Sequence, residues 1–469
     1  MRANRVVSSV AMFATAALPI VTLAFCADTQ ASDSVAERER AVESGLLPGV
    51  LVAGDSVPTY SIAARMEHYK VPGISIAVIN DGKIEWARGY GVQEVGSSDS
   101  VTASTRFQAA SISKPVAATA ALRLVEEGKL KLDANVNDEL KSWRVPDNKF
   151  TAKQPVTLAE ILSHTAGLTV HGFPGYAAGE KVPSPVDVLD GKGNTDPVRV
   201  DTVPGSIWRY SGGGYTVAQV LIHDVTGETF AAAMKRLVLD PLEMKQSTYD
   251  QPLPEQLADS AAVAYRSNGN AVEGRWHTYP ERAAAGLWTT PSDLARFALG
   301  IRAAYLGEDG AILKQPTARQ MLTERMGGYG LGVAVEGAGD SLRFSHGGAN
   351  EGYRAFFVLY PATGDGVAVM TNSDAGVALY MEVVRAVARA YGWPDFKPET
   401  RTVVQVAPDV IERYVGDYVL DEDFVISITR DGGQLFASYP GQPKARLLAE
   451  SETQFFPEGN PLRLTFERN

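Results

Sequence analysis

Residues 107–127 read Phe107-Gln-Ala-Ala-Ser111-Ile-Ser-Lys114-Pro-Val-Ala-Ala-Thr-Ala-Ala-Leu-Arg-Leu-Val-Glu-Glu127, and a glycine, Gly128, follows. The alanine-rich part predicts a helix from Ser113 that stops at this glycine. Ser111 and Lys114 lie three positions apart, so their side chains face the same way on one helical turn. A serine hydroxyl becomes a nucleophile when a base takes its proton. A lysine can serve as that base when burial or a nearby cation lowers its pKa, and the apolar residues after Lys114 favour burial.

The Ser-x-x-Lys spacing taken alone is weak, because a helix cap followed by a solvated lysine has the same pattern. Two further segments add to it. Trp208-Arg-Tyr210-Ser-Gly212-Gly-Gly-Tyr215 places a tyrosine before a glycine run at a predicted helix start. Residues 342–349, Leu-Arg-Phe-Ser-His-Gly-Gly-Ala, place a histidine and two glycines at the end of a predicted strand. Glycines there let a substrate approach the strand edge, where backbone N–H groups can face an oxyanion.

The predicted elements are segregated along the chain. Residues 73–79 and 83–88 are β-rich runs joined by a turn that contains Asp81-Gly82, which predicts a hairpin. Helical patterns dominate the middle of the chain, and strands return later at residues 342–345, 353–360 and 366–371, followed by a helix at 378–391. This order predicts an α+β fold, in which an antiparallel sheet from both ends of the chain is flanked by helices and carries a helical insertion.

The expected domain organisation has five parts. A signal peptide covers residues 1–31, a polar leader 32–57, and the main domain 58–395. A Pro-rich and polar linker covers 396–409, and short strands with turns at 410–469 predict a small all-β, barrel-like module that stops short of closure. A Gly- and Pro-rich stretch at 165–206 is expected to be a long loop at the mouth of a cleft.

The first residues have the composition of an export signal. Arg2 and Arg5 precede an apolar run over residues 6–26, and small residues follow up to Ala31, which is the expected cleavage point. The alternative is an uncleaved membrane anchor, whereas a lipid anchor on Cys26, the only cysteine, is disfavoured by the bulky Phe25 before it. We therefore expect a secreted or periplasmic protein whose mature form has no stable membrane span and no thiol chemistry.

The composition excludes several partners and cofactors. The 469-residue chain has a net charge of -11, and no Lys/Arg run is present, so nucleic acid is not an expected partner. His164 and His171 have no carboxylate that completes a ligand spacing, so no metal is expected. His164 is interpreted as a hydrogen-bonding loop residue at the turn before Gly167. No nucleotide-binding glycine pattern follows a strand, and no cofactor is predicted.

The three segments, in this order, resemble the serine β-lactamase and penicillin-binding-protein superfamily, and the tyrosine form resembles its class C-like branch with D-aminopeptidase, DD-peptidase and esterase relatives. Residues 156–168 and 285–294 are also similar to that branch, and the C-terminal module resembles a lipocalin-like domain. The resemblance implies a β-lactamase/transpeptidase-like fold with residues 58–395 as its serine hydrolase domain. It implies Ser111 as nucleophile, Lys114 as its proton acceptor or charge partner, Tyr210 as proton shuttle, His346 as the third basic residue, and an oxyanion held by the backbone of Ser111 and Ala349. Which of the lysine and the tyrosine is the general base stays open.

The sequence also departs from that family. Gly212 stands where an Asn is frequent, and His346-Gly347-Gly348 replaces Lys-Thr-Gly. The three glycine positions are the expected substrate-binding backbone. A permanent cation that could hold a substrate carboxylate becomes a titratable ring. Arg354 is a candidate for the missing cation, with a solvated strand arginine as the alternative. If His346 must be neutral, activity is expected to fall below about pH 6.

These observations predict a secreted serine hydrolase that cleaves amide or ester bonds of small molecules or short peptides through an acyl-enzyme on Ser111. A β-lactamase or a carboxylesterase of the same fold is the alternative within this class. A catalytically inactive protein that binds a ligand or the cell wall is the alternative outside it. The sequence leaves the oligomeric state open.

Overall fold

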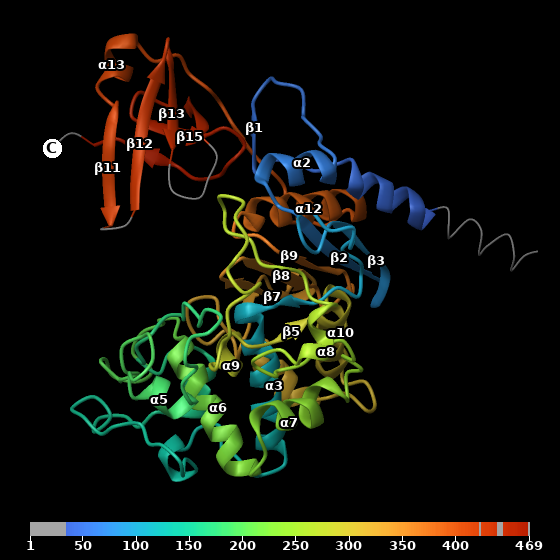
Figure 1. Cartoon of the computed structure of the whole chain (residues 1–469), viewed down its shortest axis with the longest axis vertical. Coiled ribbons are helices and arrows are strands. Elements are labelled where there is room, and N and C mark those ends of the chain that lie inside the picture. Colours follow the sequence, from blue (N-terminus) through green and yellow to red (C-terminus); the bar gives the residue numbers. More distant parts are fainter. Residues whose placement is uncertain (1–33, 422–423, 439–443, 468–469) are drawn as a thin grey trace, which may run out of the picture.

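The computed structural model of the chain describes residues 34–421, 424–438 and 444–467 (Figure 1). The expected signal peptide at residues 1–31, with Cys26, therefore lies outside the described residues. No helix in the described part of the chain has the length and apolar character needed to cross a bilayer.

The main domain is built on a six-stranded antiparallel sheet in the order β3-β2-β9-β8-β7-β6. The adjacent pair β2 and β9 joins the beginning of the domain to its end, so the sheet closes around a long insertion. The α+β fold predicted from the sequence is therefore confirmed. The strands are β2 (Gly73–Asn80), β3 (Lys83–Gly91), β6 (Ala334–Glu336), β7 (Arg343–Asn350), β8 (Tyr353–Leu359) and β9 (Gly366–Thr371).

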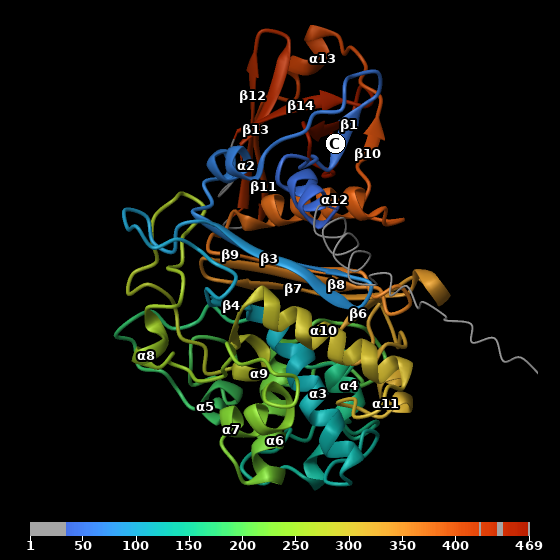
Figure 2. The ribbon, with the colours of Figure 1, turned by 90° about the vertical axis from the view of Figure 1, so that its right-hand side faces the viewer.

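Both faces of the sheet are buried, which explains the apolar composition of its central strands. Along β2, Ile74, Ile76 and Val78 pack into the cluster that contains α12 (Gly376–Tyr391), whereas Ala77 and Ile79 pack into the cluster on the opposite face. This alternation is the period of two that a strand imposes on its side chains. Figure 2 shows α12 above the sheet and α10 (Pro291–Leu306) below it.

The hairpin predicted around Asp81-Gly82 is present. Both turn residues have positive φ angles, 49° and 72°, as a two-residue hairpin turn with the native strand twist requires.

The insertion forms a helical part below the sheet, organised around α3 (Ser113–Glu126) and α6 (Gly212–Thr226) (Figure 1). Residues 165–206 are mostly irregular, as expected, apart from one short helix. The remaining α-helices are α2 (Ile62–Tyr69), α4 (Leu158–Leu162), α5 (Pro185–Leu189), α7 (Phe230–Met234), α8 (Glu255–Ala258), α9 (Arg282–Ala285) and α11 (Gln315–Met321). A two-stranded sheet pairs β4 (Phe107–Gln108) with β5 (Trp288–Thr289). The short 3-10 helices are η1 (Ala110–Ile112), η2 (Val136–Asp138) and η4 (Gly339–Ser341), and η3 (Lys235–Leu239) is a π-helix.

The segment interpreted as a leader, residues 32–57, differs from that expectation where it is described. Residues 34–43 form a helix, and Val42 and Leu46 are buried in the same cluster as α12. Strand β1 (Val50–Val52) then pairs in parallel with β10 (Glu399–Arg401), which lies inside the expected linker. The apolar side chains that become buried here are few, and the polar composition of the segment did not predict a packed helix.

The C-terminal residues form a second six-stranded antiparallel sheet in which each strand pairs with the next one along the chain. The sheet is curled, and its first and last strands do not pair with each other among the described residues, so it is a half-barrel. A short helix, α13 (Pro408–Glu412), precedes it. The strands are β11 (Gly416–Asp421), β12 (Phe424–Asp431), β13 (Gln434–Ser438), β14 (Ala445–Ala449), β15 (Gln454–Pro457) and β16 (Leu464–Thr465).

Candidate active site

Ser111 lies in the tight turn η1, directly before α3. The preceding residue, Ala110, has a φ of 50°, a conformation that costs a non-glycine residue about 1–2 kcal/mol. Ser113 holds this turn, because its hydroxyl donates to the carbonyl of Ala110 (2.6 Å) and accepts from the backbone N–H of Leu287 (2.9 Å). The serine predicted as nucleophile is therefore presented on a strained and tightly fixed turn.

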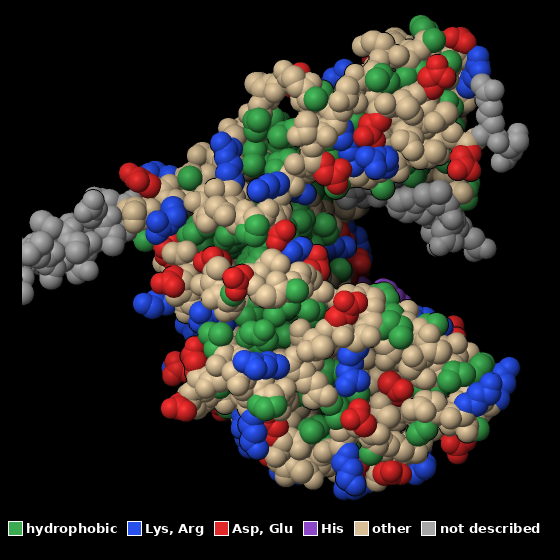
Figure 3. Space-filling model, turned by 180° about the vertical axis from the view of Figure 1, so that it is seen from behind, with side chains coloured by type: hydrophobic (Ala, Val, Ile, Leu, Met, Phe, Trp, Pro, Cys, Tyr) green, Lys and Arg blue, Asp and Glu red, His purple; other side chains and the backbone are tan. Residues whose placement is uncertain are grey.

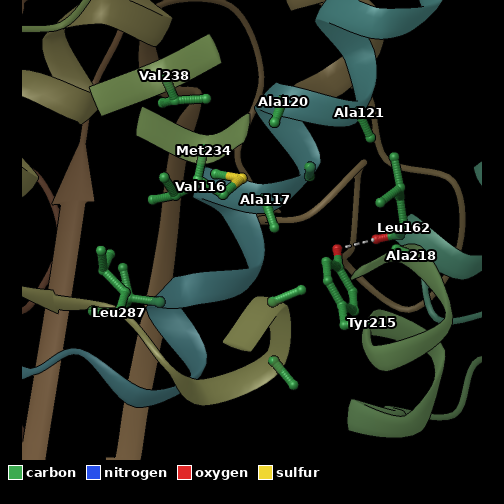
Figure 4. Close-up of a cluster of buried hydrophobic side chains, with 14 of the residues drawn as sticks. Val116, Ala117, Ala120, Ala121, Leu162, Tyr215, Ala218, Met234, Val238 and Leu287 are labelled. Carbon is green, nitrogen blue, oxygen red and sulfur yellow. Dashed lines mark hydrogen bonds between the residues drawn. The ribbon is translucent and has the colours of Figure 1, made fainter. Parts of the chain in front are cut away.

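Lys114 points from the first turn of α3 back to this serine. Its Nζ lies 2.9 Å from Oγ of Ser111 and 2.8 Å from the carbonyl oxygen of Ala284 in α9. The residue is only 2% exposed. Figure 4 shows the apolar side chains around α3, to which α6 contributes Tyr215, whose hydroxyl donates to the carbonyl of Leu162.

The environment of Lys114 favours a neutral amine. Burial lowers the pKa of Lys114 from 10.5 to about 7, and no carboxylate in the described part of the chain forms an ion pair with it. Desolvation penalises the ammonium form, and the carbonyl of Ala284 and nearby ring faces offset this penalty only in part. At neutral pH about half of the lysine side chains are therefore able to accept a proton.

Tyr210 stands immediately before α6, whose N-cap is Ser211. Its hydroxyl is within hydrogen-bonding reach of the Ser111 side chain, and Nζ of Lys114 lies 4.8 Å from the centre of its ring. Burial raises the pKa of Tyr210 above its usual value, although the hydrogen bond with Ser111 opposes this shift. The structure thus brings the hydroxyl and the amine of one segment and the phenol of another to one point.

His346 lies on β7 beside this group, with its ring centre 6.3 Å from that of Tyr210. Burial, together with the nearby Lys114, lowers the pKa of His346 to about 3, even though its Nδ1 contacts the carbonyl of Gly347 at 2.6 Å. The ring is therefore neutral throughout the physiological range. The expected loss of activity below about pH 6 assumed that His346 has the pKa of a solvated histidine, and burial makes that assumption wrong.

Strand β7 offers an open edge at this place. Strand β6 pairs only with residues 343–345, so residues 346–350 have β8 on one side and no described strand on the other. In an antiparallel strand alternate backbone N–H groups point to the same edge. Gly347 and Ala349 are exposed there, and this edge is the natural place for an oxyanion to meet backbone N–H groups.

Two of the expected substrate-binding glycines have another role. A side chain at Gly212 would meet the ring of Phe173 at 2.9 Å, and its N–H already donates to the carbonyl of His171. A side chain at Gly348 would lie 2.1 Å from the carbonyl oxygen of Ala109. Both positions are buried, so these glycines permit close backbone packing around the site.

Arg354 does not supply the missing cation. Its guanidinium pairs with Asp374 at 2.8 Å and donates to the carbonyl of Asn350. The site as described therefore has a neutral histidine where the family pattern has a permanent charge.

Two features near Ser111, Lys114 and Tyr210 were not predicted from the sequence. The carbonyl of Ala284 holds the amine of Lys114, and backbone contacts of this kind have no sequence signal. The interpretation of His164 as a hydrogen-bonding residue at a turn is confirmed, because it lies in the turn after α4 and its Nδ1 accepts the N–H of Ser211. The sequence did not reveal that its buried ring lies 4.2 Å from that of Tyr210.

Comparisons with known sequences place the chain in a family. The sequence profile of the Beta-lactamase family matches residues 61–391, and the chain belongs to that family. It is 27% identical over 341 residues to penicillin-binding protein 4 of Amycolatopsis lactamdurans, a match that covers 69% of this chain and 86% of that protein. It is also 27% identical over 352 residues to the unguisins hydrolase ungD of Aspergillus violaceofuscus, and this match covers 65% of this chain and 59% of that protein.

Solved structures share the fold. The octameric penicillin-binding protein homologue from Pyrococcus abyssi superimposes with a TM-score of 0.63 at 23% identity, over 86% of this chain and 93% of that one. The D-amino acid amidase from Ochrobactrum anthropi SV3 superimposes with a TM-score of 0.60 at 21% identity, over 76% of this chain and 99% of that one.

Proposed function

We propose that this protein is a serine hydrolase that cleaves amide or ester bonds of small molecules or short peptides through an acyl-enzyme on Ser111. The observation that carries the proposal is the buried Lys114, which touches Oγ of Ser111 and has no acidic partner among the described residues. A fully desolvated amine is costly to a fold, and perturbed groups of this kind gather at catalytic sites. The match to the Beta-lactamase family supports the same conclusion.

The proposed acylation step uses the groups that meet at Ser111. The neutral amine of Lys114 takes the proton of Ser111 as Oγ attacks the substrate carbonyl, and the resulting oxyanion is held by backbone N–H groups of Ser111 and Ala349. The ammonium proton then passes through the Tyr210 hydroxyl to the leaving group as the scissile bond breaks. In deacylation a water molecule gives its proton to the same relay and attacks the ester carbonyl. The low pKa of the lysine and the high pKa of the tyrosine favour Lys114 as the base.

The charge of the site restricts the substrate. His346 is neutral, and Arg354 is engaged by Asp374, so neither can hold a substrate carboxylate by charge. The proposed substrates therefore carry a neutral group at the position that faces β7. This favours neutral amides and esters over β-lactams and over peptides with a free carboxylate near the scissile bond.

One experiment tests the class of activity. The protein is incubated with a fluorophosphonate, and the mass of intact protein and of its peptides is measured, with Ser111→Ala as the control. We expect one adduct, on Ser111, that the variant lacks. Absence of the adduct in the wild-type protein would support the inactive binding protein.

A second experiment separates the substrates. A short-chain p-nitrophenyl ester, a D-alanyl p-nitroanilide and nitrocefin are compared by kcat/KM. We expect the neutral ester or the anilide to exceed nitrocefin. The reverse order would favour a β-lactamase and would require a cation in the site.

We also propose that the protein is exported and cleaved after Ala31, which rests on the composition of residues 1–31. N-terminal sequencing of the protein recovered from the periplasm or medium is expected to begin near Ser32. A chain that begins at Met1 would contradict cleavage.

A further inference from the structure

His164 forms hydrogen bonds with both sequence neighbours of Tyr210. It is the second residue after α4, and its backbone carbonyl accepts the N–H of Arg209 at 2.8 Å. Its ring Nδ1 accepts the N–H of Ser211 at 3.0 Å. A single residue thus holds the N–H groups of the two residues on either side of Tyr210.

The ring of His164 also packs against the tyrosine itself. The ring centres are 4.2 Å apart with an interplanar angle of 32°, and the histidine is only 2% exposed. Because Nδ1 accepts a hydrogen bond, the proton of the neutral ring is on Nε2. This Nε2 has no hydrogen-bond partner in the described part of the chain, so the fold keeps a buried polar atom unsatisfied at this position.

The backbone of His164 is unfavourable as well. Its φ of 59° lies in the left-handed region, which at the end of a helix is usually occupied by glycine or, less often, asparagine. A histidine there costs conformational energy, and its unsatisfied Nε2 adds to that cost. Two independent costs at one residue beside a catalytic group point to a role that glycine cannot perform.

We infer that His164 is a positioning residue for Tyr210: its Nδ1 and carbonyl hold the backbone on either side of the tyrosine, so that the phenol stays in reach of Ser111. The inference rests on the proposed function, because it assigns a role within that reaction. Without the Nδ1 acceptor, the buried N–H of Ser211 loses its partner, and the segment from Arg209 to Ser211 is free to shift. A shift of about 1 Å in a catalytic group lowers a rate roughly 100-fold.

The chain offers a matched pair of variants. His164→Asn and His164→Gly both suit a left-handed backbone, and both remove the imidazole ring. They differ in the acceptor, because the Asn Oδ1 is joined to the chain through the same number of bonds as Nδ1. His164→Gln is the third variant; it keeps a long side chain but moves its acceptor one bond farther out.

The test measures kcat and KM with a p-nitrophenyl ester, and the melting temperature of each variant. We expect His164→Asn to keep kcat within about threefold, and His164→Gly and His164→Gln to lose roughly 10- to 100-fold in kcat with little change in KM. Equal kcat values for the Asn and Gly variants would overturn the inference, whether both are high or both are low. A glycine variant that does not fold leaves the comparison of Asn with Gln to decide.

The failure of the proposed function is distinguishable from the failure of this inference. A wild-type protein that hydrolyses neither ester nor amide and takes no fluorophosphonate removes both. A wild-type protein that turns over the ester, with Asn and Gln variants of equal kcat, removes the positioning role alone.

Discussion

The candidate active site and the C-terminal half-barrel differ in how they accommodate polar groups. In the candidate site Lys114, His164 and His346 are buried with no ionic partner among the described residues, and their lowered pKa values favour the neutral forms. In the half-barrel, basic and acidic side chains lie beside one another at the surface (Figure 3), and Arg463 and Glu450 pair at 2.6 Å. Among the described residues of that sheet, the buried ones are apolar.

The difference follows from the size of the core. The main domain buries a large apolar cluster that spans the sheet and the helices below it, whereas the described core of the half-barrel has eight buried residues. Only a large core gains enough free energy from burial to carry unsatisfied ionisable groups, since each costs several kcal/mol. The large core of the main domain can therefore carry the buried ionisable groups of the candidate active site, whereas the described core of the half-barrel is apolar.

The largest expected effect comes from removing the buried amine. Lys114→Met introduces an unbranched side chain that is only one atom shorter than lysine and has no amine to accept a proton, so kcat/KM for a p-nitrophenyl ester should fall roughly 10³- to 10⁴-fold. The melting temperature should change little, because removing the desolvated amine offsets the loss of its hydrogen bond to the buried carbonyl of Ala284. A loss below tenfold, with the protein folded, would show that Lys114 is not the base.

The pH dependence of the rate comes next in size. A base must be deprotonated, and the pKa of Lys114 is lowered to about 7, so log kcat/KM should rise with slope 1 below pH 7 and level off above it. At pH 5 the rate should be about 100-fold below the plateau. The pKa of His346, lowered to about 3, adds no step in this range. A profile that is flat from pH 5 to 8 would contradict this assignment of the base.

A third prediction concerns Glu281, which is 0% exposed and has no hydrogen-bond partner on either carboxylate oxygen among the described residues. Burial raises the pKa of Glu281 to about 7 from 4.5. As pH rises, Glu281 ionises at a lower pH in the unfolded chain than in the folded protein. The contribution of Glu281 to stability is therefore fully present below pH 4.5 and is lost between pH 4.5 and about pH 7. The loss amounts to about 3 kcal/mol.

Glu281→Gln should therefore raise the free energy of unfolding at pH 8 and leave it nearly unchanged at pH 4, as measured by urea denaturation. Glu450→Gln in the half-barrel is the matched control. The pKa of Glu450 is lowered by its hydrogen bond with Arg463, so this variant should destabilise slightly at pH 8, with the opposite sign. Changes in the free energy of unfolding that have the same sign and size in both variants would show that the two regions do not differ in how they accommodate a carboxylate.

Particular residues show how far the sequence could be used. The hairpin at Asp81-Gly82 was predictable because turn chemistry is local, and the pairing of Ser111 with Lys114 was predictable because a helical turn sets their spacing. The convergence of Tyr210 on that pair was expected from the resemblance of three motifs and not from spacing. The helix at residues 34–43, which buries Val42, was missed because polar side chains dominate its composition.

The sequence by itself determined the fold class, the strained serine turn's place before a helix, and the residue types available for acyl transfer. Only the tertiary structure decided that the lysine has no counter-ion, that His346 is neutral, that Gly212 and Gly348 serve packing, and that His164 grips the segment around Tyr210. The reason is physical. Local geometry and periodicity act between neighbours in the chain, whereas desolvation and hydrogen bonding depend on which distant segments exclude water from a given atom.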